Sequence, residues 1–214
     1  MMGTWLSELG AGLVATILLT LCAAAVSAAG GILVVAARLS GHNLLGVPAR
    51  VYVSFMRGTP VLVQLFLVYF SLPALGLGGH PFAAASVAIG LNSAGYVAEI
   101  LRGAILAVSP GQREAAEAIG LPPARYWRRV LLPQALISAL PALTNEATLL
   151  LKTTPLASAV AVTELTFSGQ IIIARTYEAG RVLAVISLGY LVLSFAITRA
   201  SALLEHRLAL KGGA

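Results

Sequence analysis

The sequence contains no aspartate, only one cysteine and only two lysines among its 214 residues, and charged residues make up just 10% of it. With Cys22 as the only cysteine, neither an intrachain disulfide nor a cysteine-based metal cluster can form. The chain lacks a GxxxxGKS or GxxxxGKT segment, so it has no loop of the kind that cradles nucleotide phosphates. Because no Ser/His/Asp arrangement or metal-ligand cluster is present either, we expect no catalytic residue, no metal site, no cofactor bound by this chain and no enzyme activity of the chain alone.

Apolar residues, in contrast, are abundant: they make up 58% of the chain and give it a mean hydropathy of +0.91. A water-soluble fold of this size could not bury so much apolar surface, so we expect lipid to be its solvent. The apolar runs are long enough to cross a bilayer, for which about 20 residues suffice. The sequence predicts an all-α membrane protein with about five transmembrane helices in a single domain. The predicted helices span residues 9–37, 56–75, 81–107, 133–152 and 182–204.

The net charge of +6 lies in short segments between the apolar runs, which is typical of topology-determining charge rather than of nucleic-acid binding. Residues 38–57, 111–129 and 199–214 together hold ten Lys and Arg residues. The positive-inside rule therefore predicts that these segments are cytoplasmic loops, with the amino terminus outside and the carboxyl terminus inside. A sixth crossing would move the basic tail outside, so we expect residues 155–174 to form a partial or re-entrant helix. The amino-terminal segment has no Lys or Arg before its apolar run, which favours a retained helix over a cleavable signal peptide.

The most specific pattern is EAAEAIGLPPARYWRRVLLP, which begins at Glu114 within a cytoplasmic loop predicted at residues 111–132. It predicts a helix, a sharp turn at Gly120 and a second short helix that begins at Pro122 and Pro123. Aromatic residues beside arginines favour a docking surface for a protein partner. The alternative, from the residues alone, is a solvated loop whose aromatic side chains anchor in the headgroup region.

This loop resembles the EAA motif of ABC importer permeases, in which EAA, a glycine and an aliphatic-x-Leu-Pro segment follow at fixed spacing. The matching residues are Glu114, Ala115, Ala116, Gly120, Val130, Leu131, Leu132 and Pro133, with Val130 where isoleucine is usual. Three further segments, residues 55–73, 92–105 and 140–156, are similar to polar amino-acid permeases of the histidine/glutamine type.

The resemblance implies the transmembrane-domain fold of a type I ABC importer in the bacterial inner membrane. In that family the loop is a coupling helix that seats in a groove of a cytoplasmic ATPase subunit. The implied partners are two ATPase subunits that hold ATP and Mg, a second permease subunit (an identical copy or a sister chain), and a periplasmic or lipid-anchored substrate-binding protein. The expected ATPase-coupling residues are Glu114, Ala115, Ala116, Gly120, Leu121, Arg125 and Tyr126.

Polar residues within the predicted helices are costly in lipid and usually face a bundle interior or a water-filled path. In the third helix Asn92, Tyr96 and Glu99 share one face, at i, i+4 and i+7. A zwitterionic amino acid needs an acceptor for its ammonium group and a donor for its carboxylate, which glutamate, lysine and amide side chains supply. The predicted substrate-path residues are Gln64, Asn92, Tyr96, Glu99, Asn145, Glu146, Thr148, Lys152 and Thr153.

The alternative is that these residues hold helices together, for example Glu99 with Arg102 at i+3, or Glu146 with a neighbouring helix. Many permeases that the chain resembles carry aspartate after the lysine, whereas this chain has Thr153 after Lys152. Because an aspartate there would pair with a cationic side chain, its absence favours substrates other than arginine, lysine and histidine.

The residues and the resemblance together favour the permease subunit of an ATP-driven, binding-protein-dependent importer of an amino acid or amino-acid derivative, working by alternating access. The runner-up is an ion-coupled secondary transporter or channel without an ATPase, which explains the buried Glu and Lys residues but gives residues 114–133 no special role. A third alternative is a sensory or scaffold membrane protein that uses the loop for docking alone.

Overall fold

The computed structural model describes residues 2–76 and 80–212, and this part of the chain folds almost entirely into helices, with no strand in it. The predicted all-α fold class is thereby confirmed. The longest helices are α1 Met2–Leu39, α4 Pro81–Ala107 and α9 Ala179–Gly212. Within the described residues these three helices are long and apolar enough to cross a bilayer, and counting each of two bent helix pairs as one further span gives five.

The central helix is α4, which packs against α1, α2, α3 and α7. Its crossing with α1 depends on small residues. A Cβ on Gly90 would lie 2.6 Å from the Cβ of Val26 and 2.7 Å from the carbonyl oxygen of Ala23, so only glycine permits this approach. Small residues are the usual means of bringing helices together in lipid, where no hydrophobic force acts between them.

The predicted second helix, residues 56–75, is instead part of a sharply bent pair. α2 Asn43–Gly58 and α3 Val61–Ser71 meet at 113°, and a 3₁₀ turn, η1 Pro73–Leu75, follows. The break lies at Pro60, which has no N–H to continue the helix. Proline also disfavours helical geometry in the residue before it, and Thr59 is extended, at φ −120° and ψ 148°.

The basic segment 38–57 is therefore mostly the helix α2, and its prediction as a loop was wrong. Besides its arginines, this segment has small and apolar residues at the helical spacing i, i+3 and i+7, namely Gly46, Ala49 and Val53. These three residues are buried, and Val53 packs in a cluster with Val35 of α1 and Ala98 of α4. Tertiary packing on two neighbouring helices stabilises a helix that hydropathy alone did not indicate.

The second bent pair follows the loop region. α7 Leu132–Thr153 runs through Pro141 without interruption, and then come the 3₁₀ helix η3 Thr154–Val160 and α8 Leu165–Thr176. The bend before α8 is 52°. With 12 residues, α8 is about 18 Å long, too short to cross a bilayer alone. It agrees with the partial helix predicted for residues 155–174.

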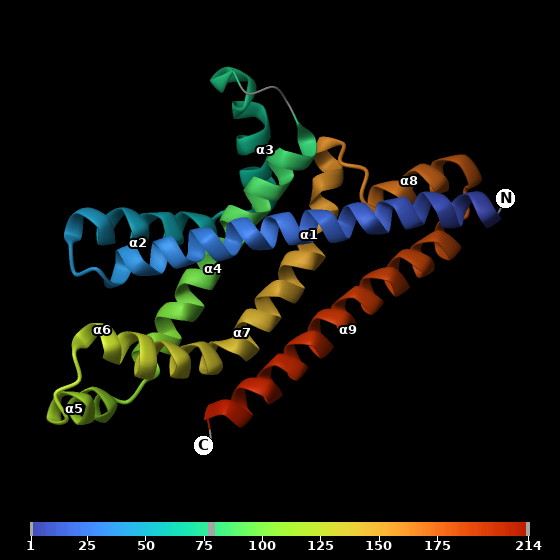
Figure 1. The fold of residues 1–214 in the computed structure, drawn as a ribbon. Coiled ribbons are helices and arrows are strands. Elements are labelled where there is room, and N and C mark those ends of the chain that lie inside the picture. Colours follow the sequence, from blue (N-terminus) through green and yellow to red (C-terminus); the bar gives the residue numbers. More distant parts are fainter. Residues whose placement is uncertain (1, 77–79, 213–214) are drawn as a thin grey trace.

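Figure 1 shows the amino-terminal end of α1 beside α8 and the start of α9, while α5 Pro110–Ala118 and α6 Pro123–Tyr126 lie at the opposite end of the molecule. An ion pair of 3.0 Å between Arg175 of α8 and Glu8 of α1 lies at the first end. α9 then returns along the molecule, so its carboxyl-terminal end lies on the side of α5 and α6.

Candidate functional site

The predicted loop 111–132 is a helix–turn–helix unit, which we call the α5–α6 knob and define as residues 110–131. It contains α5, α6 and a π-helical turn, η2 Trp127–Leu131, which continues directly into α7. Both of its α-helices begin with a proline at the first position, where the missing N–H costs no hydrogen bond. The knob is therefore joined to α4 by a short connection and to α7 by continuous helix.

The turn of the knob is set by Gly120, whose φ is +68°. The N–H of Leu121 donates to the carbonyl of Ala116 at 2.9 Å, and the N–H of Gly120 donates to the carbonyl of Glu117 at 3.0 Å. This pair of bonds is a Schellman motif, which ends α5 and requires a left-handed residue at the glycine position. Glycine adopts this conformation at no steric cost, so the motif's glycine has a backbone role.

The knob has its own small apolar core. Ala116, Tyr126 and Leu131 are buried, and Leu121 and Ile105 pack against them. Because Ile105 belongs to the last turns of α4, the core fixes the knob to the end of that helix. Two of the predicted coupling residues, Ala116 and Tyr126, thus face the interior of the knob.

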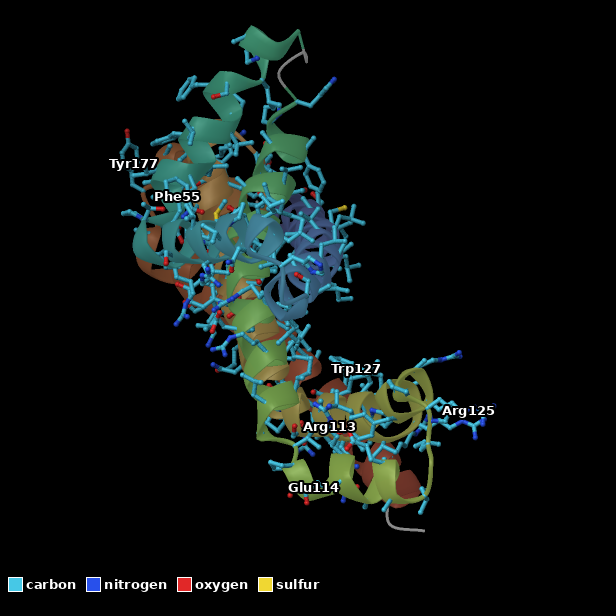
Figure 2. All side chains as sticks on the ribbon, turned by 90° about the vertical axis from the view of Figure 1, so that its left-hand side faces the viewer. Phe55, Arg113, Glu114, Arg125, Trp127 and Tyr177 are labelled. Atoms are coloured by element: carbon cyan, nitrogen blue, oxygen red, sulfur yellow. The ribbon has the colours of Figure 1, made fainter. Side chains whose placement is uncertain are left out.

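The outer surface of the knob carries three further predicted residues, whereas Leu121 packs against the core. Glu114, Ala115 and Arg125 are exposed, and Figure 2 shows Glu114 and Arg125 pointing away from the body of the molecule. Arg113 forms an exposed ion pair with Glu117 at 2.8 Å; the hydrogen bond and the charge of that carboxylate raise the pKa of Arg113. A cavity of about 170 Å³ lies between α5 and α6; it is lined by Arg113, Ala116, Glu117, Leu121, Pro123, Tyr126 and Trp127.

Ile119, which precedes the turn glycine and is 79% exposed, was not among the predicted residues. It follows Ala118, the last residue of α5, and an aliphatic side chain at such a position can pack into a core. The left-handed turn at Gly120 instead directs the chain back toward α6 and leaves Ile119 outside. A large apolar side chain this exposed on a compact unit is typical of a contact with another protein.

Of the predicted substrate-path residues, Gln64 and Asn92 lie at the joint between α2 and α3. The amide nitrogen of Gln64 donates to the hydroxyl and carbonyl oxygens of Thr59, at 2.7 and 3.2 Å, and to the carbonyl of Met56 at 3.0 Å. The amide nitrogen of Asn92 donates to the same Met56 carbonyl at 2.8 Å and to the Gln64 side-chain oxygen at 3.1 Å. The two amides therefore satisfy carbonyl groups that the break at Pro60 leaves free.

Tyr96 and Glu99 lie further along the same face of α4 and contact arginines. The guanidinium carbon of Arg57 is 5.3 Å from the centre of the Tyr96 ring, a cation–π geometry. Glu99 pairs with Arg102 on its own helix, at 2.8 Å, and with Arg38 from α1. The predicted alternative for Glu99, a pairing with Arg102, is present in the structure.

Glu146 lies on the other side of α4. It accepts a hydrogen bond of 2.6 Å from Ser93, whose hydroxyl in turn accepts one of 2.9 Å from Ser27 of α1. The carboxyl group also lines a largely apolar cavity of about 260 Å³ among α1, α4 and α7. Because Asn92 and Ser93 are consecutive, α4 divides the predicted path residues between two sides. They do not form one cluster.

The remaining predicted residues lie on α7. Asn145 and Lys152 are exposed, and within the described residues neither side chain has a hydrogen bond or ion pair. The hydroxyl groups of Thr148 and Thr153 donate to backbone carbonyls one turn earlier, at 3.0 and 2.8 Å. Asn145, Thr148 and Lys152 share one helix face, at i, i+3 and i+7.

A fully buried glutamate, Glu164, was not among the predicted residues. It caps α8 by accepting hydrogen bonds from the N–H groups of Phe167 and Thr166, at 2.8 and 3.0 Å. It also accepts one of 2.6 Å from the Tyr190 hydroxyl of α9. An acidic N-cap before an apolar run is a recognisable signal in the sequence, TELTFSG, and it indicates a structural role. In the part of the chain that the structure describes, no three His, Cys, Asp or Glu residues come together as metal ligands.

Comparison with known proteins places this geometry in a family. The family profile described as "binding-protein-dependent transport system inner membrane component" matches residues 28–210. The chain is 37% identical over 180 residues to the octopine transport system permease protein OccM of Rhizobium radiobacter, covering 80% of this chain and 74% of the relative. It is 38% identical over 180 residues to the glutamine transport system permease protein GlnP of Escherichia coli K12, covering 83% and 82%.

Solved structures agree with the sequence relatives. A crystal structure of an amino acid ABC transporter with histidines superposes with a TM-score of 0.88 at 34% identity, covering 96% of each chain. The inward-facing methionine ABC transporter MetNI shares the fold at 22% identity, with a TM-score of 0.71 over 95% of this chain and 94% of that one. The predicted type I importer fold is thereby confirmed. The chain belongs to the binding-protein-dependent inner membrane transport components, and within them to the amino-acid ABC transporter permeases.

Proposed function

We propose that this chain forms the translocation path of an ATP-driven amino-acid importer and that the α5–α6 knob is its contact with the ATPase. The observation that carries the proposal is the construction of the knob. Its core of Ala116, Tyr126 and Leu131 makes it a firm unit, while Glu114 and Ile119 remain on its surface for a partner. A firm unit with an exposed apolar side chain and charges is what a docking contact requires.

The knob also has the attachments that coupling requires. Ile105 seats it on the end of α4, and η2 continues from it into α7. A force on the knob would therefore act on the two helices that carry most of the polar residues of the membrane region. ATP binding to the partner would favour the outward-facing state, and release of ADP and phosphate would favour the inward-facing state. The nucleotide can shift this equilibrium only if it binds one of the two states more tightly than the other.

The partners follow from the family. We propose two cytoplasmic ATPase subunits that hold ATP and Mg, a second permease subunit that is either an identical or a sister chain, and an external substrate-binding protein. This chain has no phosphate-binding loop of its own, so it would act as the membrane subunit and not as the enzyme. Two permease subunits around a two-fold axis would enclose the path between them.

For the path itself, the polar face of α7 supports a role best. Asn145 and Lys152 are exposed and without partners among the described residues, so they are free to bind a cargo or a facing subunit. Lys152 would bind the carboxylate of an amino acid. Gln64, Asn92, Tyr96 and Glu99 would shape the path from the α2 side, and Glu146 and Thr153 are the other proposed contributors. With threonine at position 153, we expect neutral amino acids or their derivatives to be preferred over cationic ones.

The test is transport by the reconstituted complex, driven by ATP and the binding protein. Glu114→Lys and Gly120→Trp alter the knob, whereas Glu178→Lys and Gly180→Trp make the same changes at the opposite end of the molecule. We expect the knob variants to insert normally but to lose ATPase association or coupled hydrolysis, and the controls to keep both. Normal coupling in both knob variants would contradict the proposal, and uptake without any ATPase would favour an ion-coupled transporter.

A further inference from the structure

α2 has three distinct faces. Gly46, Ala49 and Val53 are buried against α1 and α4. Next to them on the helix surface lie Arg50, Ser54 and Arg57, at i, i+4 and i+7, all exposed. Beyond these runs an apolar stripe of Leu44, Val47, Val51 and Phe55, of which Leu44 is 90% and Val51 62% exposed. Phe55 is visible at the surface in Figure 2, well away from the knob.

The cationic face of α2 borders a cavity, which we call the arginine pocket. Its volume is about 280 Å³, and it is lined by Arg38, Arg50, Val53, Ser54, Arg57 and Glu99. The lining residues come from α1, α2 and α4, so the pocket exists only in the folded chain. Glu99 is also a proposed path residue, but neither the coupling proposal nor the proposed substrate path accounts for the three arginines of the pocket.

The pocket has more positive than negative charge. Arg50, Arg57 and Arg102 lie close enough to Arg38 to act on it electrostatically. The single carboxylate, Glu99, is paired with Arg38 and Arg102. Across the residues that the structure describes, Arg50 and Arg57 have no acidic partner, and Arg57 has only the Tyr96 ring. Positive charges held close together beside an apolar bundle repel one another, which is unfavourable. A bound anion would offset this repulsion.

We propose that the arginine pocket binds the phosphate group of an anionic phospholipid, whose acyl chains lie along the apolar stripe of α2. Arginine suits this ligand because its planar guanidinium group binds phosphate oxygens in pairs and is held readily at a membrane surface. The apolar stripe decides between phosphate sources: a free anion would leave Leu44, Val51 and Phe55 in contact with water, whereas a lipid covers them. A basic pocket between membrane helices is a recurrent form of lipid site.

The experiment uses the full-length chain, purified with its partner subunits and placed in bilayers with spin-labelled phosphatidylglycerol or spin-labelled phosphatidylcholine. We expect the protein to immobilise phosphatidylglycerol preferentially. Each arginine near an anionic lipid contributes a factor of roughly five in affinity, so Arg50→Gln with Arg57→Gln should remove most of that preference. Arg50→Lys with Arg57→Lys should restore part of it, since the charge remains but the paired hydrogen bonds do not.

The control is Arg175→Gln with Arg181→Gln, which removes the same charge from the α8–α9 region and should leave the preference intact. Equal immobilisation of the two lipids by the unmodified protein would overturn the proposal. Equal losses of the preference in the Arg50→Gln, Arg57→Gln variant and in the Arg175→Gln, Arg181→Gln control would also overturn it. A lipid preference displaced by millimolar glutamine would assign the pocket to the cargo carboxylate instead. Disulfide formation between two copies of Ser54→Cys, in a Cys22→Ala background, would assign the α2 surface to a second permease and also overturn it.

Discussion

The α5–α6 knob and the polar residues around α4 differ in how their residues come together. The knob is built from residues 110–131, with Ile105 and the adjoining Leu132 packed against its core, so its pattern is local. The polar residues of α4 take their partners from distant segments: Asn92 from α2 and α3, Glu99 from α1, and Ser93 from α1 and α7. A pattern of contiguous residues can be recognised in a sequence. Which side of a helix packs against which neighbour cannot, because it depends on the tertiary fold.

The two regions also use their side chains differently. In the knob, charged and apolar residues such as Glu114 and Ile119 remain exposed, while its core holds few residues. In the membrane region most polar groups around α4 are already occupied by the chain's own groups. Among the described residues, Asn145 and Lys152 on α7 and Arg50 on α2 are exposed and have no such partner. The difference predicts that substitutions around α4 lower stability in addition to any effect on transport. Substitutions on the knob surface or on α7 should change function alone.

The largest effect is expected at the α2–α3 joint. Asn92→Leu removes the hydrogen bonds to the Met56 carbonyl and to Gln64, leaving buried polar groups unsatisfied. The expected loss is about 1–3 kcal/mol in the free energy of unfolding. Asn145→Leu makes the same change at an exposed amide and should be close to neutral. Thermal unfolding in detergent measures both, and equal destabilisation would contradict the structural role of the joint.

A smaller but functionally clear effect is expected at Ile119. Ile119→Ser should leave the thermal stability of the chain unchanged, because the side chain is exposed, and should lower ATP-driven transport about tenfold by removing an apolar contact worth about 1–2 kcal/mol. Tyr126→Ser in the core of the knob should lower stability as well. Binding-protein-stimulated ATP hydrolysis and unfolding are measured on the same preparations. Unchanged coupling in the Ile119→Ser variant would show that the Ile119 side chain does not contribute to the ATPase contact.

At Lys152 we expect an effect on substrate affinity alone. Lys152→Met should raise the KM for uptake about fivefold to tenfold, since a charge-assisted hydrogen bond to a carboxylate contributes about 1–1.5 kcal/mol at a partly solvated site. Lys152→Arg should keep most of the affinity. Uptake of labelled glutamine into proteoliposomes separates KM from the maximal rate. A fall in the maximal rate with unchanged KM would argue against a carboxylate contact.

The smallest effect is expected from the exposed pair on α5. Arg113→Ala breaks the 2.8 Å pair with Glu117, but exposed i,i+4 pairs contribute only about 0.3–0.5 kcal/mol. Thermal unfolding should therefore shift by no more than a degree or two. A large loss would mean that Arg113 supports the cavity between α5 and α6 and belongs to the architecture of the knob.

The sequence by itself determined the membrane class, the approximate places of four of the five predicted helices and the helix–turn–helix form of residues 111–132. Each of these depends on a local property: apolar run length, charge between runs, or a glycine between two short helices. It also placed Asn145, Thr148 and Lys152 on one helix face, because helical periodicity is fixed by the backbone.

Only the tertiary structure decided which polar residues remain available. It folded the basic segment 38–57 into α2, because packing against α1 and α4 stabilises a helix whose own hydropathy is low. In the fold, the amides of Gln64 and Asn92 donate to a carbonyl group that the break at Pro60 leaves free, and Glu164 caps α8. The tertiary structure also turned Ile119 outward and gathered arginines from three helices around Glu99. These outcomes depend on contacts between distant segments, which run lengths and local motifs do not encode.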